Sequence, residues 1–334
     1  MNRRKFLSGK NMRTAFALAA FTLAACAVAP APVIGTAGAD PVMSEKTMEH
    51  DGRNRSYLVH DFSGGKPAPV VFVLHGGGGH AENAVNMSQF DVVAAREQLI
   101  AVYPAGTGGM PGGRLLTWNA GHCCAYAREN RIDDVGFISN IIDELVASGK
   151  ADRKRIYVTG MSNGGMMSHR LALELPGKIA AIAPVVGALF GDEVMSQPAN
   201  PSPPFSTLSV LMIVGATDPT VPAAGGPLAG GGNRAISTLR SKPEDRDTIS
   251  TRAAADFWAT ANGCTGPVES STPAAATLTY AKCRNGAEVT LVSVANNGHA
   301  WPGGKPGRAE ADPPSMAWNA SEEMWAFFKR HPRQ

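Results

Sequence analysis

The feature that most constrains this fold is a series of short apolar runs that alternate with segments of helical spacing. Residues 70–74 (VVFVL) form a continuous apolar run rich in β-branched side chains, which is typical of a strand buried on both faces. Residues 209–214 (SVLMIV) also predict a strand. Segments with the spacing of helices are found over 90–98, 134–146 and 166–175. This alternation predicts an α/β fold with a mostly parallel central sheet and helices on both faces.

The other expected elements continue the same alternation. Asp133 or Asp134 is a natural N-cap for the helix over 134–146. Further strands are expected over 56–60, 99–103, 155–159, 179–186 and 289–294, and further helices over 256–262 and 316–330.

Three stretches rich in Gly or Pro interrupt this rhythm, over 106–124, 198–204 and 222–232. Long loops in compact domains are usually functional or mobile insertions. We therefore expect residues 188–206 and 222–252 to shape the acyl and alcohol pockets of a site.

Charge is unevenly distributed, which limits the partners that the chain can have. Five of its 31 basic residues lie within residues 1–39, which contain no acidic residue. The rest of the chain therefore has 26 basic and 28 acidic residues. Nucleic-acid binding needs a concentrated basic face on the folded part, so no nucleic-acid partner is expected. With 44% hydrophobic residues among 334, the chain can bury a large core and is not a disordered protein.

Residues 1–39 have the layout of an export signal, with basic residues first and then an uncharged run over 14–25. The opening residues 2–7 (NRRKFL) also resemble a twin-arginine signal. A retained membrane anchor is the alternative, but Pro30 and Pro32 break the segment. We predict an exported protein, either secreted or periplasmic.

Two cleavage sites compete at the end of this signal. Residues 37–39 (AGA) fit an ordinary signal peptidase site, which leaves one folded domain over 40–334. A lipobox before Cys26 would instead make that cysteine a lipidated N-terminus. A lipid anchor at Cys26 is the one contact with a membrane that we expect.

The mature domain contains four cysteines, an even number in an oxidising compartment. Four cysteines allow three pairings. A bridge between Cys264 and Cys283 would close a short loop between a predicted helix and a predicted strand. Cys123 and Cys124 would then pair with each other or stay reduced. No metal site is expected, because His122 and the two cysteines after it cannot easily converge on one ion.

The sharpest chemical signal is the G-x-S-x-G pattern over 160–164 (GMSNG), placed between a predicted strand and a predicted helix. Small residues there permit a tight turn that exposes Ser162 at the carboxyl edge of the sheet. The alternative is an ordinary glycine-rich turn with a capping serine. A serine hydroxyl needs a base to act as a nucleophile, and that base must be oriented by a third group.

Two later residues supply those groups. Asp218 follows an apolar strand, and His299 lies in a loop just after the last predicted strand, so both are placed at the carboxyl edge, where catalytic groups of open α/β sheets gather. The order Ser162, Asp218, His299 is the one expected of the α/β-hydrolase arrangement. Asp192 and Asp245 also lie between the serine and the histidine and are the alternatives to Asp218.

A run of glycines over 75–79 (HGGGG) directly follows a buried strand. Backbone N–H groups in such a loop can stabilise the negative charge that builds on a carbonyl oxygen during acyl transfer. We expect the donors of this oxyanion hole to be the N–H groups of Gly77 and Asn163, with His75 holding the loop. A phosphate loop is the alternative, but the Lys-Ser/Thr that it requires is missing.

Five motifs recur in one order: 75–79 (HGGGG), 118–124 (WNAGHCC), 133–137 (DDVGF), 160–165 (GMSNGG) and 298–304 (GHAWPGG). Together they resemble the motifs of the polyhydroxybutyrate depolymerase-like esterases, α/β-hydrolases that include bacterial feruloyl and acetylxylan esterases. The resemblance spans roughly residues 55–330. It implies a cofactor-free serine esterase with the triad named above, and it supports Gly77 as an oxyanion donor and the Cys264–Cys283 bridge.

The resemblance does not identify which ester is the substrate. Hydroxyalkanoate (polyhydroxybutyrate-type) oligomers or polymer are the favoured substrates, and soluble oligomers come first because no appended substrate-binding domain is evident. A feruloyl or acetylxylan esterase is the alternative, and a peptidase or a non-catalytic surface binding protein is less favoured. Trp118 and Trp301 would either form an aromatic wall for the substrate or pack beside the site.

Overall fold

The computed structural model describes residues 41–110, 112–191, 208–228 and 247–334. Predicted features outside these ranges are the export signal with Cys26, the Pro-rich stretch over 198–204, and parts of the two segments expected to shape the pockets.

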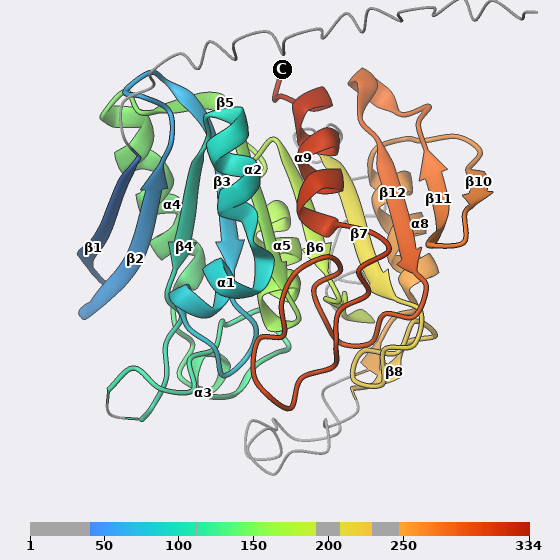
Figure 1. Cartoon of the computed structure of the whole chain (residues 1–334), viewed down its shortest axis with the longest axis horizontal. Coiled ribbons are helices and arrows are strands. Elements are labelled where there is room, and N and C mark those ends of the chain that lie inside the picture. Colours follow the sequence, from blue (N-terminus) through green and yellow to red (C-terminus); the bar gives the residue numbers. More distant parts are fainter. Residues whose placement is uncertain (1–40, 111, 192–207, 229–246) are drawn as a thin grey trace, which may run out of the picture. The chain divides into compact units, whose positions relative to one another are not determined.

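Ten of the described strands form one sheet: β1 (Val42–His50), β2 (Arg53–Asp61), β3 (Ala68–Leu74), β4 (Ile100–Pro104), β5 (Ala151–Met161), β6 (Ala181–Val185), β7 (Ser209–Gly215), β10 (Val268–Ser271), β11 (Ala275–Tyr280) and β12 (Val289–Val294). Their order is β1-β2-β4-β3-β5-β6-β7-β12-β11-β10 (Figure 1). The strands from β4 to β12 in this order run parallel, and antiparallel pairs flank them at both edges. The predicted mostly parallel sheet is confirmed. A separate short ladder joins β8 (Gly226–Pro227) and β9 (Asp247–Thr248).

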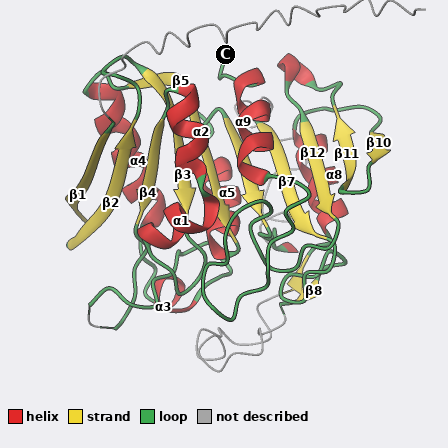
Figure 2. Cartoon of the chain, viewed as in Figure 1, coloured by secondary structure: helices red, strands yellow, loops and turns green. Residues whose placement is uncertain are grey.

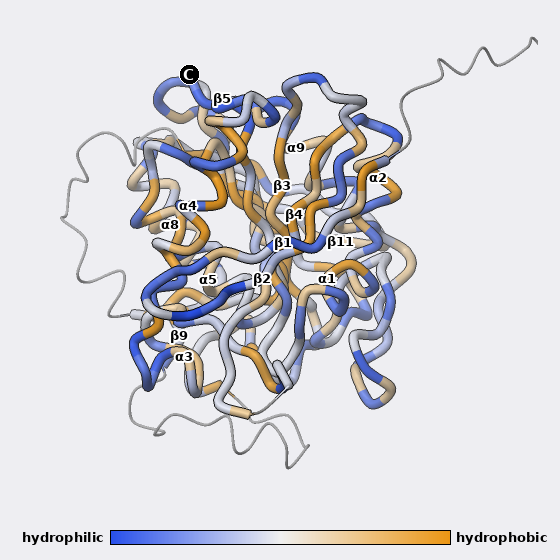
Figure 3. Tube along the Cα trace, turned by 90° about the vertical axis from the view of Figure 1, so that its left-hand side faces the viewer, coloured by the Kyte–Doolittle hydropathy of each residue, from blue (hydrophilic) through white to orange (hydrophobic). Residues whose placement is uncertain are grey.

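Helices cover both faces of this sheet, as predicted. The described helices are α1 (Ala81–Ser88), α2 (Phe90–Glu97), α3 (Ala125–Glu129), α4 (Asp134–Ala147), α5 (Asn163–Glu174), α8 (Thr251–Ala261), α9 (Ala320–Arg330) and a 3₁₀ turn, η3 (Arg284–Gly286). Helices α4, α5 and α8 pack on one face, and α1, α2 and α9 pack on the other (Figures 1 and 3).

Strand β3 shows why continuous apolar runs predict this architecture. Val70, Phe72 and Leu74 belong to the core under α4 and α5, whereas Val71 and Val73 belong to the core under α1 and α9. All five side chains are fully buried. Because successive side chains of a strand point to opposite faces, a strand covered on both sides needs an apolar residue at every position. Figure 3 shows the same layering, with hydrophobic segments between the two groups of helices.

Two of the elements that differ from the sequence-based expectation show the physical reason for the difference. Strand β1 was not predicted, because most of its side chains are polar or exposed. Its backbone pairs with β2 along its whole length, Met48 packs against the core, and Lys46 pairs with Glu144 at 2.8 Å. The closing helix begins at Ala320 rather than at residue 316, because the side chain of Asn319 caps it by accepting the N–H of Glu322 at 3.1 Å.

The parallel strands place their carboxyl ends on one side of the sheet. Figure 2 shows that the loops after β3, β5, β7 and β12 gather there, close to α3 and β8. The predicted catalytic residues lie in these loops. Of the helices that the structure describes, none has the length and apolar character needed to cross a membrane.

Candidate active site

Ser162 occupies the turn between β5 and α5. Its φ angle is +54°, a value that is uncommon for a residue other than glycine and that occurs at the strained strand-to-helix turn of a nucleophilic serine. Its N–H donates to the carbonyl of Val185 at 2.9 Å, and its own carbonyl accepts the N–H of Met166 at 2.8 Å. The backbone of the turn is therefore held from both neighbouring elements.

Two glycines of the motif are required by the close packing of this turn. A Cβ atom at Gly164 would lie 2.5 Å from the carbonyl oxygen of Leu74, and one at Gly160 would lie 2.7 Å from the backbone of Gly164. Helix α5 thus reaches the end of β3 only because these positions carry no side chain. The contact brings the N-terminus of α5 beside the glycine-rich loop that follows β3.

Asp218 and His299 are in direct contact. Nδ1 of His299 lies 2.8 Å from Oδ2 of Asp218, whose side chain is only 2% exposed. The other oxygen of Asp218 accepts the N–H groups of Thr220 and Val221 at 2.7 and 3.0 Å. The carboxylate is therefore fixed by the backbone on one side and holds the imidazole on the other. The alternatives Asp192 and Asp245 lie outside the described residues.

Two further side chains fix the loop that carries His299, and the sequence did not reveal either of them. The Nδ2 group of Asn297 donates to the carbonyls of Gly298 and Ala300 at 2.9 and 3.0 Å. Oδ2 of Asp312 accepts the backbone N–H of His299 at 2.7 Å. Asp312 lies in an irregular segment rich in Gly and Pro, where no periodic pattern marks a position.

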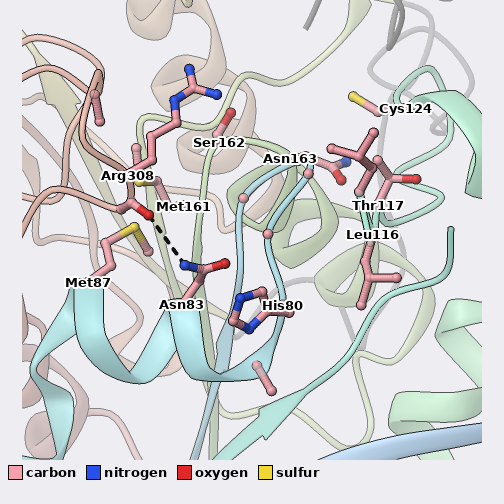
Figure 4. A pocket seen from close by; sticks show the side chains of 18 of the residues that line it. His80, Asn83, Met87, Leu116, Thr117, Cys124, Met161, Ser162, Asn163 and Arg308 are labelled. Carbon is pink, nitrogen blue, oxygen red and sulfur yellow. Dashed lines mark hydrogen bonds between the residues drawn. The ribbon is translucent and has the colours of Figure 1, made fainter. Parts of the chain in front are cut away.

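Ser162, His299, Gly77 and Asn163 all line one cavity of about 1390 Å³. Figure 4 shows Met161, Ser162, Asn163 and Arg308 among the side chains that line this cavity. Within the described ranges no hydrogen bond joins the Ser162 hydroxyl to the His299 ring. Hydrogen bonds between catalytic groups often shorten only in the complex with substrate.

The glycine-rich loop lies against the turn of Ser162. A Cβ atom at Gly76 would be 3.7 Å from Cβ of Ser162, and one at Gly77 would be 3.7 Å from Cβ of Asn163. The N–H of Gly78 is taken by the carbonyl of Leu116 at 2.7 Å, whereas among the described residues no acceptor pairs with the N–H groups of Gly77 and Asn163. Two neighbouring donors are thus available where the sequence predicts the oxyanion hole.

His75 holds this loop in a neutral form. Its Nε2 atom accepts the N–H of Gly106 at 3.0 Å, so its Nδ1–H donates to the carbonyl of Gly76 at 2.8 Å. Burial lowers the pKa of His75 to about 4. Protonation would remove the acceptor for Gly106 and would place a charge in the core.

We therefore expect the protein to lose stability as the pH falls. The pKa of His75 is about 4 in the folded state, against about 6.5 in an unfolded chain. Between these values the unfolded state binds more protons, so the free energy of unfolding falls as the pH falls through this window. The shift corresponds to about 3 kcal/mol at most.

Thermal unfolding from about pH 7.5 to about pH 4.5 measures this effect. The fall in Tm with pH should be shallower for His75→Gln than for the wild-type protein, whatever their difference at pH 7.5. Burial also lowers the pKa of His169, to about 3, but that contribution is common to both proteins. Equal slopes would show that His75 is not the titrating group.

The two tryptophans proposed as a substrate wall are buried. Trp118 is 0% exposed and Trp301 1% exposed. The indole N–H of Trp118 donates to the carbonyl of His75 at 3.0 Å, and that of Trp301 donates to Oγ of Ser321 at 3.1 Å. Trp118 is not among the residues that line the cavity, so it packs behind the site and presents no face to a substrate. Trp301 lines the cavity but exposes little of its ring.

The structure pairs Cys264 with Cys283 and Cys123 with Cys124. The first pair is the bridge that was expected, and the second is one of the two states left open from the sequence. Cys283 lies just before η3 rather than at the end of β11. In the part of the chain that the structure describes, no group of three or more His, Cys, Asp or Glu side chains is arranged to hold a metal ion.

The sheet order and the serine at a strand-to-helix turn define the class of protein. A mostly parallel sheet covered on both faces, with a G-x-S-x-G turn at its carboxyl edge, is an α/β-hydrolase. Residues 62–230 match the phospholipase/carboxylesterase family (Abhydrolase_2). The chain belongs to this family and is a carboxylic ester hydrolase.

Similar curated proteins are esterases. The chain is 32% identical over 279 residues to "Putative esterase NocK" of Nocardia uniformis subsp. tsuyamanensis, covering 80% of this chain and 76% of that protein. It is 32% identical over 246 residues to feruloyl esterase B of Piromyces equi, covering 74% of this chain but only 42% of that protein. It is 26% identical over 161 residues to poly(3-hydroxyalkanoate) depolymerase C of Paucimonas lemoignei, covering 47% and 38%. These matches confirm the resemblance to this group of esterases.

Solved structures show the same fold at low sequence identity. A thermostable esterase superposes with a TM-score of 0.53 at 15% identity, over 87% of this chain and 63% of that chain. Acetyl xylan esterase from Aspergillus awamori superposes with a TM-score of 0.50 at 14% identity, over 77% and 94%. The predicted α/β-hydrolase fold is confirmed.

Proposed function

We propose that this esterase is an exported serine hydrolase in which Ser162 is the nucleophile, His299 the general base and Asp218 the residue that orients His299. The supporting observation is the geometry at the carboxyl edge of the sheet. Ser162 stands in a left-handed turn, and His299 presents Nδ1 to Asp218 at 2.8 Å. With Nδ1–H given to the carboxylate, Nε2 of His299 is left to accept the proton of the Ser162 hydroxyl during the reaction.

Hydrolysis then proceeds in two steps. Oγ of Ser162 attacks the ester carbonyl carbon while Nε2 of His299 takes the hydroxyl proton, and the oxyanion accepts hydrogen bonds from the N–H groups of Gly77 and Asn163. The C–O bond of the ester breaks as His299 protonates the leaving alcohol, which leaves an acyl-enzyme. Water repeats the attack with His299 as base and releases the acid. Each oxyanion donor contributes about 2.7–4 kcal/mol to the stability of the transition state.

The favoured substrates are short aliphatic esters of the hydroxyalkanoate type. The proposal is supported by the cavity lining, in which the aromatic side chains Tyr57 and Trp301 are each 1% exposed and offer no open ring face. The larger apolar side chains of the described lining that are partly exposed are Leu58, Leu115, Met161 and Leu228, and none of them is aromatic. Flexible apolar side chains of this kind fit an aliphatic acyl chain better than a planar ring.

Feruloyl ester hydrolysis is the second candidate. It is supported by relatives named feruloyl esterases, one of which is 32% identical over 246 residues. The two candidates differ in what the acyl pocket must accept, which is a branched aliphatic chain in one case and a planar aromatic ring in the other.

A comparison of two substrates separates them. We expect the purified protein to release acid from a 3-hydroxybutyrate oligomer with a kcat/KM at least about tenfold higher than from methyl ferulate, because a shape mismatch in an apolar pocket costs about 1–3 kcal/mol. Ser162→Ala serves as the blank. A higher kcat/KM for methyl ferulate would select the second candidate, and no release above the blank would reject both.

Export is proposed from residues 1–39, whose layout is that of a signal. The molecular mass of the mature protein tests the proposal, because cleavage after Ala39 and lipidation of Cys26 give different masses. A mature protein that retains residues 1–25 would contradict it.

A further inference from the structure

The segment around Trp118 joins the two loops that carry the oxyanion donors. The backbone N–H of Trp118 donates to Oδ1 of Asn163 at 2.8 Å, and Nδ2 of Asn163 donates back to the carbonyl of Trp118 at 3.1 Å. Both residues are buried, with exposures of 0% and 2%. The side-chain amide of Asn163 thus makes two hydrogen bonds with the backbone of Trp118, one as acceptor and one as donor.

The indole of Trp118 reaches the other loop. Its Nε1–H donates to the carbonyl of His75 at 3.0 Å, and its ring lies against the imidazole of His75 with the centroids 4.9 Å apart. His75 in turn donates to the carbonyl of Gly76, the residue before the proposed donor Gly77. One tryptophan is therefore bonded to the donor loop after β3 and to the donor residue at the start of α5.

A buried ion pair anchors this segment from behind. Oδ2 of Asp134 accepts the backbone N–H of Asn119 at 2.7 Å, and Oδ1 of Asp134 accepts from Nη2 of Arg55 at 2.7 Å. The side chains of Asp134 and Arg55 are 0% and 3% exposed. Burial raises the pKa of Asp134, and the guanidinium of Arg55 opposes this shift. The anchor comes from β2 and from α4, and no residue of α4 belongs to the described cavity lining.

The distance between the two donors depends on these contacts. Gly77 and Asn163 belong to separate segments of the chain, and no hydrogen bond between their own backbones sets their separation. An oxyanion hole works only when both donors lie about 2.7–3.1 Å from the developing charge. A shift of a fraction of an ångström in either loop would weaken one of the two hydrogen bonds.

We infer that the Trp118 segment is the positioning element of the oxyanion hole: Trp118 and the side chain of Asn163 set the separation of the two donors, and Asp134 holds that segment in place. The inference rests on the proposed function, since it presumes the donors Gly77 and Asn163. It gives the WNAG and DDVGF motifs a role in the reaction. It also replaces the substrate-wall interpretation of Trp118.

Trp118→Phe and Asn163→Ala test this inference. The first removes the indole donor to His75 but keeps an aromatic ring, and the second removes both side-chain bonds to Trp118 but keeps the backbone N–H of residue 163. We expect each variant to lower kcat by about tenfold or more, with KM within about threefold, because the lost interaction acts on the transition state. Activity is expressed per active site, counted by end-point labelling with a fluorophosphonate, so that misfolded protein does not contribute.

Trp258→Phe is the matched control. Trp258 is also fully buried, its indole N–H donates to Nδ1 of His169 at 3.2 Å, and its ring stacks on that imidazole. This Trp–His pair does not line the cavity. We expect the control to lower Tm about as much as Trp118→Phe and to change kcat per site by less than about twofold.

The outcomes separate this inference from the proposed function. If Trp118→Phe and Asn163→Ala keep kcat per labelled site within about twofold of wild type, the positioning role is wrong although the esterase stands. A loss confined to the number of labelled sites would likewise show a purely structural role. If the wild-type protein is not labelled, or Ser162→Ala hydrolyses esters as fast as wild type, the proposed nucleophile fails instead.

Discussion

Replacing Ser162 with alanine is expected to lower kcat for ester hydrolysis by at least about 10⁴-fold, since removal of a nucleophile in such a triad leaves only the contribution of binding and the oxyanion hole. The turn itself should persist, because its backbone hydrogen bonds to Val185 and Met166 do not involve the hydroxyl. The measurement is the initial rate of acid release from a soluble ester, with Tm recorded for both proteins.

Ser168→Ala is the control for this substitution. Ser168 lies on α5, which begins directly after Ser162; it is buried and donates to the carbonyl of Gly164 rather than lining the cavity. It should keep kcat within about threefold of wild type. If Ser162→Ala stays within about tenfold of wild type, another residue must be the nucleophile.

The second large effect is expected for Asp218→Asn. An amide in place of the carboxylate cannot stabilise the imidazolium that forms at His299, and it favours the wrong tautomer of the ring. We expect kcat to fall by about 10⁴-fold, with little change in KM. The fold should be retained, because an amide oxygen can still accept the N–H groups of Thr220 and Val221 that now bond to Asp218.

Asp312→Asn gives the contrast. Asp312 bonds the backbone N–H of His299 rather than its ring, and an asparagine oxygen can accept the same hydrogen, so we expect a loss below about tenfold. The other acids considered from the sequence, Asp192 and Asp245, should tolerate the same change. Full activity of Asp218→Asn together with inactivity of Asp192→Asn or Asp245→Asn would assign the role to one of those residues.

The sequence predicted the central sheet because its strands are buried on both faces. A strand such as β3 must be apolar at every position, and that requirement is visible without a structure. Strand β1 has no such requirement. It lies at an edge, most of its side chains are polar or exposed, and it pairs with β2 through its backbone along its whole length. Backbone pairing does not depend on residue type, so the sequence does not reveal it.

Some residues of the candidate site could be predicted from the sequence and others could not. Ser162, Asp218 and His299 could be proposed because the chemistry restricts residue type and the fold restricts chain order. Asp312 could not, because any nearby segment can supply a carboxylate that accepts one backbone N–H. Trp118 was identified by its motif, but the choice between substrate contact and packing depends on burial, which one residue in a glycine-rich loop does not reveal.

The position of His299 after β12 has a consequence for refolding. Strand β12 is the last strand of the sheet in chain order, and it pairs in parallel with β7, which precedes Asp218. A folding intermediate whose sheet stops at β7 contains the serine, the aspartate and both oxyanion donors, but it has no base. Ester turnover during refolding would therefore report the addition of the last parallel strand rather than the collapse of the core.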